Sequence, residues 1–336
     1  MAESESGRSQ GGDRLPGRLG EVARALFSRI NWSKAGIALS AAIILGSGTA
    51  LFYRLRDLDW QAVAAAIRDV SAGHLAAAAA IVACGYVTLA FYDWFALRAI
   101  GARQVPWRAA AFTGAISYAV GHGVGAMAIA SAAIRYRVYS RFGLTLVDVA
   151  KICFIAGLTF WLGNITALGL GIAYMPAAAS AVDQMPGWGN RAIGIAALGA
   201  LALYLIWVSR KRRVFGPKGS SLALPSGSMT LLQIGIGLAD LSCCSLVMYM
   251  LMPEAPAVDF LSLAVVVVIG TLVGFASHAP GAIGALDLAM LVGLPDFDRA
   301  ELVATLLLYR ILYFVAPFAI ALAGLAAREG YMHFRR

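Results

Sequence analysis

The sequence predicts an all-α integral membrane protein with about six full spans and two opposed re-entrant helical hairpins. Of its 336 residues, 60% are hydrophobic and 13% are charged, whereas soluble domains carry about 25% charged residues. Apolar segments follow one another along most of the chain, and a span needs roughly 20 apolar residues. We expect a polytopic transmembrane domain over residues 35–327 between cytoplasmic tails at 1–34 and 328–336. The first tail is either disordered or carries a short interfacial helix with alternating apolar and basic faces.

The distribution of Lys and Arg predicts on which side of the membrane each apolar segment begins and ends. The segments cover residues 35–53, 74–100, 107–134, 146–174, 191–208, 228–252, 260–277, 285–295 and 300–326. Cytoplasmic loops are enriched in Lys and Arg. If every long segment crossed the membrane, the arginines at 135–141 and 210–213 would lie outside. Both groups lie inside if segment 107–134 returns to the side it entered from. Segment 285–295 is too short to span, so residues 260–295 form a second hairpin that enters from the outer side.

Two Gly-rich breaks interrupt these hairpins. Their residues are Gly121, His122, Gly123 and Gly125 in the first hairpin, and His278, Pro280, Gly281 and Gly284 in the second. Broken helices are tolerated at membrane depth only where the freed backbone is buried in protein or lines a wet cavity. The order span, span, hairpin, span then occurs twice and in opposite orientations, which predicts an inverted repeat of the kind found in many transporters.

Arg310 is the charge that the sequence places deepest. It lies about ten residues into the apolar run 300–326, so a helical rise of ~1.5 Å per residue puts its guanidinium roughly 15 Å deep. A charge at the bilayer centre costs about 2.5–3.5 kcal/mol on insertion scales. Arg310 is therefore expected either to bind an anionic lipid group or to pair structurally with Asp240 or Asp287.

Other polar residues lie within or beside the apolar segments. Asp240 is expected to balance Arg310, to take up a proton or to contact a cationic headgroup. Asp93 stands among aromatic residues near the inner end of its span, and either lies in the site or belongs to an aromatic belt. Lys151 follows the first break much as Arg310 follows the second.

A basic cluster, Arg135, Arg137 and Arg141, is expected at the inner surface, where it either receives phosphate headgroups or only marks the topology. The formal net charge of +9 then reflects the positive-inside bias and not nucleic-acid binding. The four cysteines lack metal-ligand spacing. No G-x4-G-K-[ST] motif is present, so we expect no metal and no cofactor.

Three motifs carry a family resemblance. They are YAVGHGVGAMAIASAAIRYRVYSRFGLTL at 118–146, PGAIGALD at 280–287 and LLYRILYFVAP at 307–317. In this order they resemble the Gly-rich hairpin, the P-G-G-[apolar]-G-[apolar]-F-E signature and the Y-R-x3-Y-x2-P run of the lysylphosphatidylglycerol synthase/flippase transmembrane family. Ala282 departs from the signature Gly, and Asp287 from the signature Glu.

The resemblance implies lipid handling. In the type member of that family, the multiple peptide resistance factor, the membrane half moves aminoacylated phosphatidylglycerol between leaflets and a cytosolic half makes this lipid. By resemblance, Arg310 meets the lipid phosphate or a carboxylate, and Asp93 and Asp287 match acidic family positions. Only about ten residues follow the last apolar run, so we expect no synthase domain and no enzyme activity.

We expect the protein to pass the headgroup of a polar or aminoacylated phospholipid through a cavity between the hairpins, across the bacterial inner membrane. The residues expected along this path are Arg310, Asp240, Asp93, Asp287 and Lys151. The protein's partners would be membrane lipid and a separate lipid-synthesising enzyme. Two alternatives stay open. One is an ion-coupled small-solute carrier that uses Asp240, His122 and Arg310. The other is a lipid-linked membrane glycosyltransferase that uses the outer acidic pairs Asp57/Asp59 and Asp296/Asp298.

Overall fold

The computed structural model describes residues 58–324 with gaps at 125–126, 212, 217–220 and 278–279, together with residues 45, 49, 51–53, 55 and 56. Within these residues almost every element is a helix. The pair of strands found there, β1 (Val214–Phe215) and β2 (Leu222–Ala223), forms a short antiparallel hairpin. The all-α class predicted from the sequence is therefore confirmed.

Six helices in the described residues are long and apolar enough to cross a membrane. They are α4 (Ala72–Ala99), α7 (Leu146–Tyr174), α9 (Gly187–Arg210), α10 (Gly227–Leu251), α11 (Phe260–Ser277) and the helix Arg299–Gly324, which begins as α13 (Arg299–Arg310) and passes through the π-helical turn η3 (Ile311–Val315). These six are not the six spans expected above. The expected span 35–53 lies largely outside the described residues, and α11, assigned above to a hairpin, is itself long enough to span.

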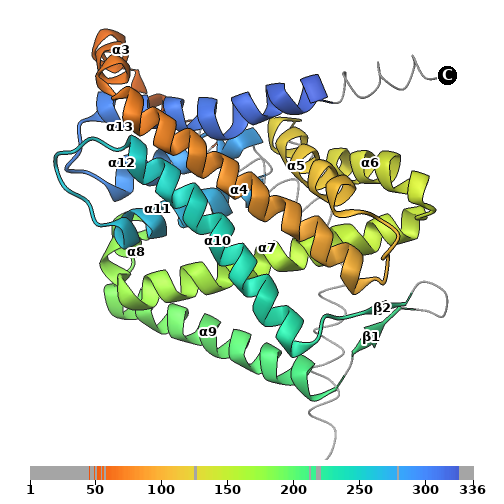
Figure 1. Cartoon of the computed structure of the whole chain (residues 1–336). Coiled ribbons are helices and arrows are strands. Elements are labelled where there is room, and N and C mark those ends of the chain that lie inside the picture. Colours follow the sequence, from red (N-terminus) through yellow and green to blue (C-terminus); the bar gives the residue numbers. More distant parts are fainter. Residues whose placement is uncertain are drawn as a thin grey trace, which may run out of the picture.

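Shorter elements connect and flank these helices (Figure 1). They are α3 (Trp60–Asp69), α5 (Trp107–Val124), α6 (Met127–Tyr139), η1 (Ser140–Phe142), α8 (Pro176–Asp183), η2 (Pro280–Ala282) and α12 (Ala285–Gly293).

Polar side chains cap the start of several long helices. Ser71 accepts a hydrogen bond from the backbone N–H of His74 at the start of α4. Thr145 and Asp148 form a capping box at the start of α7, in which two otherwise unpaired N–H groups are satisfied reciprocally.

The centre of the bundle is built where α10 crosses α4 and α7. At the second crossing two glycines touch, since a Cβ added to Gly163 would lie 2.5 Å from the Cα of Gly237. Small residues let helix backbones approach closely in membranes, where packing replaces the hydrophobic effect between helices. Gly114 of α5 has a similar role, because its Cβ would lie 3.0 Å from the carbonyl oxygen of Leu89 in α4. These contacts set a close spacing between α10 and α7 and between α5 and α4.

Two helix pairs each start and end at the same side of the bundle (Figure 1). The pair α5–α6 follows the end of α4 and returns to the start of α7, while α11 and α12 lie between the end of α10 and the start of α13. In the second pair η2 reverses the chain, with Gly281 at φ +58° and Gly284 at φ +85°, which favour glycine. This connectivity fits two opposed hairpins. The depth to which either pair enters a bilayer stays a prediction.

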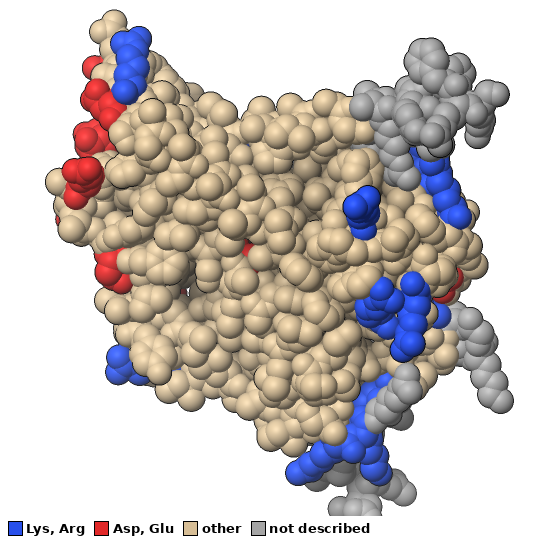
Figure 2. Space-filling view, in the orientation of Figure 1, with Lys and Arg blue, Asp and Glu red and all other residues tan. Residues whose placement is uncertain are grey.

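Charged residues separate to opposite ends of the molecule (Figure 2). Acidic side chains gather at the end where α3, α12 and the start of α13 lie, and basic side chains gather near β1, β2 and the α5–α6 pair. The surface between these ends is almost free of charge in this view. Such a band is typical of a protein that sits across a bilayer.

Candidate functional site

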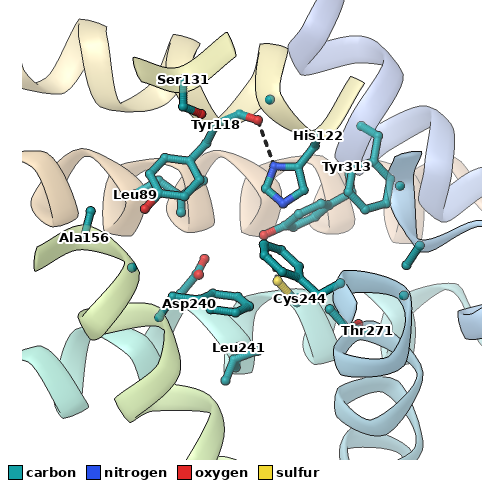
Figure 3. A pocket seen from close by; sticks show the side chains of 18 of the residues that line it. Leu89, Tyr118, His122, Ser131, Ala156, Asp240, Leu241, Cys244, Thr271 and Tyr313 are labelled. Carbon is teal, nitrogen blue, oxygen red and sulfur yellow. Dashed lines mark hydrogen bonds between the residues drawn. The ribbon is translucent and has the colours of Figure 1, made fainter. Parts of the chain in front are cut away.

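A cavity of about 300 Å³ lies inside the bundle, with walls from both helix pairs (Figure 3). The pair α5–α6 contributes Tyr118, Gly121, His122, Ser131 and Arg135, and the α11–α12 side contributes Thr271, Gly274, Phe275, Gly281, Ala282 and Leu286. The helices α4, α7, α10 and α13–η3 complete the wall, most of which is apolar. The structure thus has a cavity where the sequence analysis expected one, between the two helix pairs. Its use as a lipid path stays a prediction.

A fully buried ion pair lies beside the cavity. Asp93 of α4 is 0% exposed, and its two carboxylate oxygens accept hydrogen bonds from Nε of Arg135 in α6, each at 3.1 Å. Nη2 of Arg135 adds a bond of 2.7 Å to Oδ1, and the Tyr139 hydroxyl donates to Oδ2 at 2.6 Å. These four hydrogen bonds compensate the loss of hydration of the buried carboxylate. Buried charges are tolerated when they are paired and hydrogen-bonded in this way.

The structure corrects the predicted basic cluster, because Arg135 does not lie at the surface. The sequence analysis grouped it with Arg137 and Arg141 at the inner surface, and these two are exposed. Arg135 is instead only 3% exposed and lines the cavity, with its guanidinium carbon 5.3 Å from the centre of the Tyr118 ring. The reason is helical periodicity: Arg135 and Tyr139, four residues apart, share one face of α6, while Arg137 lies on another.

A second bidentate pair joins the two elements that follow the second break. Nη1 of Arg310 donates to Oδ1 of Asp287 at 2.7 Å, and Nη2 donates to Oδ2 at 2.6 Å. Asp287 also accepts a bond from the N–H of Gly284, which ties the pair to the reversal of the chain. Of the two partners expected for Arg310, the structure therefore selects Asp287. Neither residue lines the cavity, although their chain neighbours Leu286 and Tyr309 do.

Asp240 lines the cavity from α10 and is 6% exposed. The Tyr92 hydroxyl donates to its Oδ2 at 3.2 Å, and Oγ1 of Thr88 lies 3.2 Å from its Oδ1. In the part of the chain that the structure describes, no Lys or Arg forms an ion pair with it. Asp240 therefore differs from Asp93 and Asp287, whose charges are matched by arginines.

The remaining expected site residues are spread out. Lys151 is partly buried in the first turns of α7. His122 lines the cavity, and its Nδ1 lies 2.8 Å from the carbonyl oxygen of Tyr118 (Figure 3). Of the expected break residues, Gly121 and Gly281 line the cavity, Gly123 lies in α5, Pro280 lies in η2 and Gly284 caps α12. Gly125 and His278 lie outside the described residues.

Sequence reasoning missed the neutral partners of these charges, Thr88, Tyr92 and Tyr139. Hydroxyl side chains are common in apolar helices, so their presence alone carries no signal. For Tyr139 a signal existed, because its spacing from Arg135 places both on one helical face. For Thr88 and Tyr92 it did not, because Asp240 lies 152 and 148 residues away.

Among the described residues, no group of three or more His, Cys, Asp or Glu side chains could hold a metal ion. The fold, the buried ion pairs and the cavity define a multi-pass helical membrane protein.

Similarity to known proteins agrees with this class. The chain is 27% identical to the inner membrane protein YbhN of Escherichia coli (strain K12) over 303 residues, 88% of this chain and 92% of YbhN. It is 26% identical to the uncharacterised protein slr0712 of Synechocystis sp. (strain ATCC 27184 / PCC 6803 / Kazusa) over 309 residues, 90% and 96% of the two chains. No protein-family model matches the chain. Membership of the lysylphosphatidylglycerol synthase/flippase transmembrane family thus stays a prediction.

Proposed function

We propose that the protein moves the headgroup of a polar or aminoacylated phospholipid between the leaflets of a bacterial inner membrane, through the cavity between the two helix pairs. The similarity to the inner membrane protein YbhN supports the location. The separation of charge supports an orientation with the basic end in the cytoplasm; that both termini lie on the same side is part of the proposal. A separate enzyme would supply the lipid.

The observation that supports this proposal is a second, apolar hollow beside the cavity, which we call the groove. The groove, of about 170 Å³, lies between α7, α10 and α11 and is lined almost wholly by apolar side chains. Leu241 of α10 lines both hollows, so the cavity, which contains Asp240, His122 and Arg135, lies next to the groove. A ligand with a polar head and an apolar tail matches this pair of sites, whereas a small solute needs only the first.

Helix capping explains two of the acidic residues on which the glycosyltransferase alternative depends. Asp59 accepts hydrogen bonds from the N–H groups of Gln61 and Ala62 at the start of α3. Asp298 accepts from those of Ala300 and Glu301 at the start of α13. N-caps are common roles for Asp, so these two carboxylates have a structural explanation. The small-solute carrier keeps one observation in its favour, the unpaired Asp240 in the cavity.

A cavity-filling variant tests the proposal. Gly157 of α7 lines the cavity, and a Cβ added there meets no atom within 4 Å. Gly157→Leu should therefore fill the cavity with little strain on the fold. Gly199 of α9 also has no atom within 4 Å of an added Cβ and does not line the cavity, so Gly199→Leu is the matched control.

The measurement is mass spectrometry of lipids retained by each protein in mild detergent, together with flipping of labelled lipid in proteoliposomes. We expect one polar lipid to be enriched on the wild type and on Gly199→Leu, and to be lost, together with flipping, from Gly157→Leu. Equal retention of bulk lipid by all three proteins would refute lipid translocation through this cavity. Binding of a water-soluble compound in place of lipid would favour the solute carrier.

A further inference from the structure

The cavity contains a carboxyl group whose surroundings do not favour a negative charge. Asp240 is almost fully buried among the helices that wall the cavity (Figure 3). Transfer of an isolated ionised carboxylate into such an interior costs several kcal/mol or more unless a positive group compensates it. The partners that Asp240 has in the described residues are two neutral hydroxyls, those of Thr88 and Tyr92.

The hydrogen bonds of Thr88 identify where a proton would be. A hydroxyl has a single hydrogen to donate. Oγ1 of Thr88 lies 2.6 Å from the carbonyl oxygen of Gly85 and 3.2 Å from Oδ1 of Asp240. The shorter contact has the better geometry for that hydrogen, which leaves a lone pair of Oγ1 available toward Oδ1. With an ionised Asp240, Thr88 shares one hydrogen between two acceptors, whereas a protonated Oδ1 can donate to Oγ1 and leaves each contact its own hydrogen, while Tyr92 donates to the other oxygen.

The other groups around Asp240 are also neutral in their ordinary forms. Among the described residues, the titratable groups that interact with it are Tyr86 and Tyr92 of α4, Tyr118 of α5, Cys243 and Cys244 of α10, Tyr309 of α13 and Tyr313 of η3. On the α7 wall of the cavity stands Cys153, and α11 contains no titratable residue. His122 lines the opposite wall. The arginine of this cavity, Arg135, is already matched by Asp93.

We propose that Asp240 is a proton-binding site and that the protein couples lipid movement to the loading and release of this proton. The coupling rests on the proposed function; the proton site itself does not. In the conformation described here, Oδ1 holds the proton and donates to Thr88. When the cavity opens to water on one side, the O–H bond breaks and the proton passes to water. Opening to the other side lets Asp240 take a proton from water there, which links the cycle to a proton gradient.

Infrared spectroscopy of the purified protein tests the proton site without any transport measurement. A protonated carboxyl gives a carbonyl band that shifts in D2O. We expect this band in the wild type, its loss at alkaline pH and its absence from Asp240→Asn. Thr88→Val should fold and keep the band at a shifted frequency, because the acceptor of the proton is gone. A wild type without the band, or a band unchanged in both variants, would overturn the proton site.

Flipping of labelled lipid under an imposed pH gradient tests the coupling. A gradient of one pH unit is a tenfold ratio of proton concentration, so the wild-type rate should change by up to about tenfold. Asp240→Asn should be insensitive to the gradient. A wild-type rate that ignores the gradient would overturn the coupling. An absence of flipping in the wild type would refute the proposed function and the coupling together, and the infrared band would still decide the proton site.

Discussion

Removal of the Asp93 carboxylate should destabilise the protein more than any other change to the buried charges described here. Asp93→Asn keeps the shape of the side chain but leaves the guanidinium of Arg135 without its counter-charge. The Arg135 side chain is 4% exposed, so water cannot replace the carboxylate. Breaking a buried pair by removal of one partner costs about 3–5 kcal/mol. We expect a loss of that size in the free energy of unfolding.

A double variant distinguishes the energetic contribution of the ion pair from that of the packing around it. Asp93→Leu combined with Arg135→Met removes both charges and keeps apolar volume, and such replacements are often neutral or stabilising. The double variant should therefore be more stable than Asp93→Asn. Asp287→Asn is a useful comparison. Its partner Arg310 has a side chain that is 19% exposed, so water screens part of the uncompensated charge and the loss should be smaller.

The assay is unfolding of the purified protein in mixed micelles by added denaturing detergent, followed by circular dichroism. The reasoning fails if Asp93→Asn costs less than about 1 kcal/mol, or if the double variant is destabilised by the sum of its parts. Either result would mean that the pair contributes like an exposed salt bridge and is not the buried network that the geometry shows.

Two further predictions concern the helix crossing and the topology. Gly163→Leu should prevent folding or cost several kcal/mol, because its Cβ alone would overlap Gly237 at 2.5 Å. Gly199→Leu should fold normally, because an added Cβ there meets open space. Equal thermal stability of the two variants would contradict a tight helix crossing at Gly163. In a cysteine-labelling scan, Arg137→Cys should react with a membrane-impermeant thiol reagent only from the cytoplasmic side. Position 137 is exposed whereas Val138 is 2% exposed, so the first position is the one to label, and reaction only from outside would exclude the proposed topology.

Charges within apolar runs singled out Arg310, Asp240 and Asp93, and the match to a family signature singled out Asp287. An unneeded charge in a spanning helix is costly, and in the structure each of these residues has a hydrogen-bonding partner; their role in a site stays a prediction. The signal failed for Arg135, which stands at the edge of the polar stretch RYRVYSR and was grouped with its exposed neighbours. Local composition could not separate them, because burial depends on which face of α6 packs against α5 and α7 and points toward Asp93.

The sequence by itself determined the class of protein, the positions of most helices and the candidate residues. Spanning helices satisfy their own backbone hydrogen bonds, so hydropathy and length within one segment are enough to predict them. Only the tertiary structure decided which charges meet. Asp93 pairs with a residue 42 positions away, and Asp240 meets Tyr92 across 148 positions. Those contacts depend on how helices cross at glycines such as Gly163 and Gly237, and close packing between segments leaves no trace in the composition of either one.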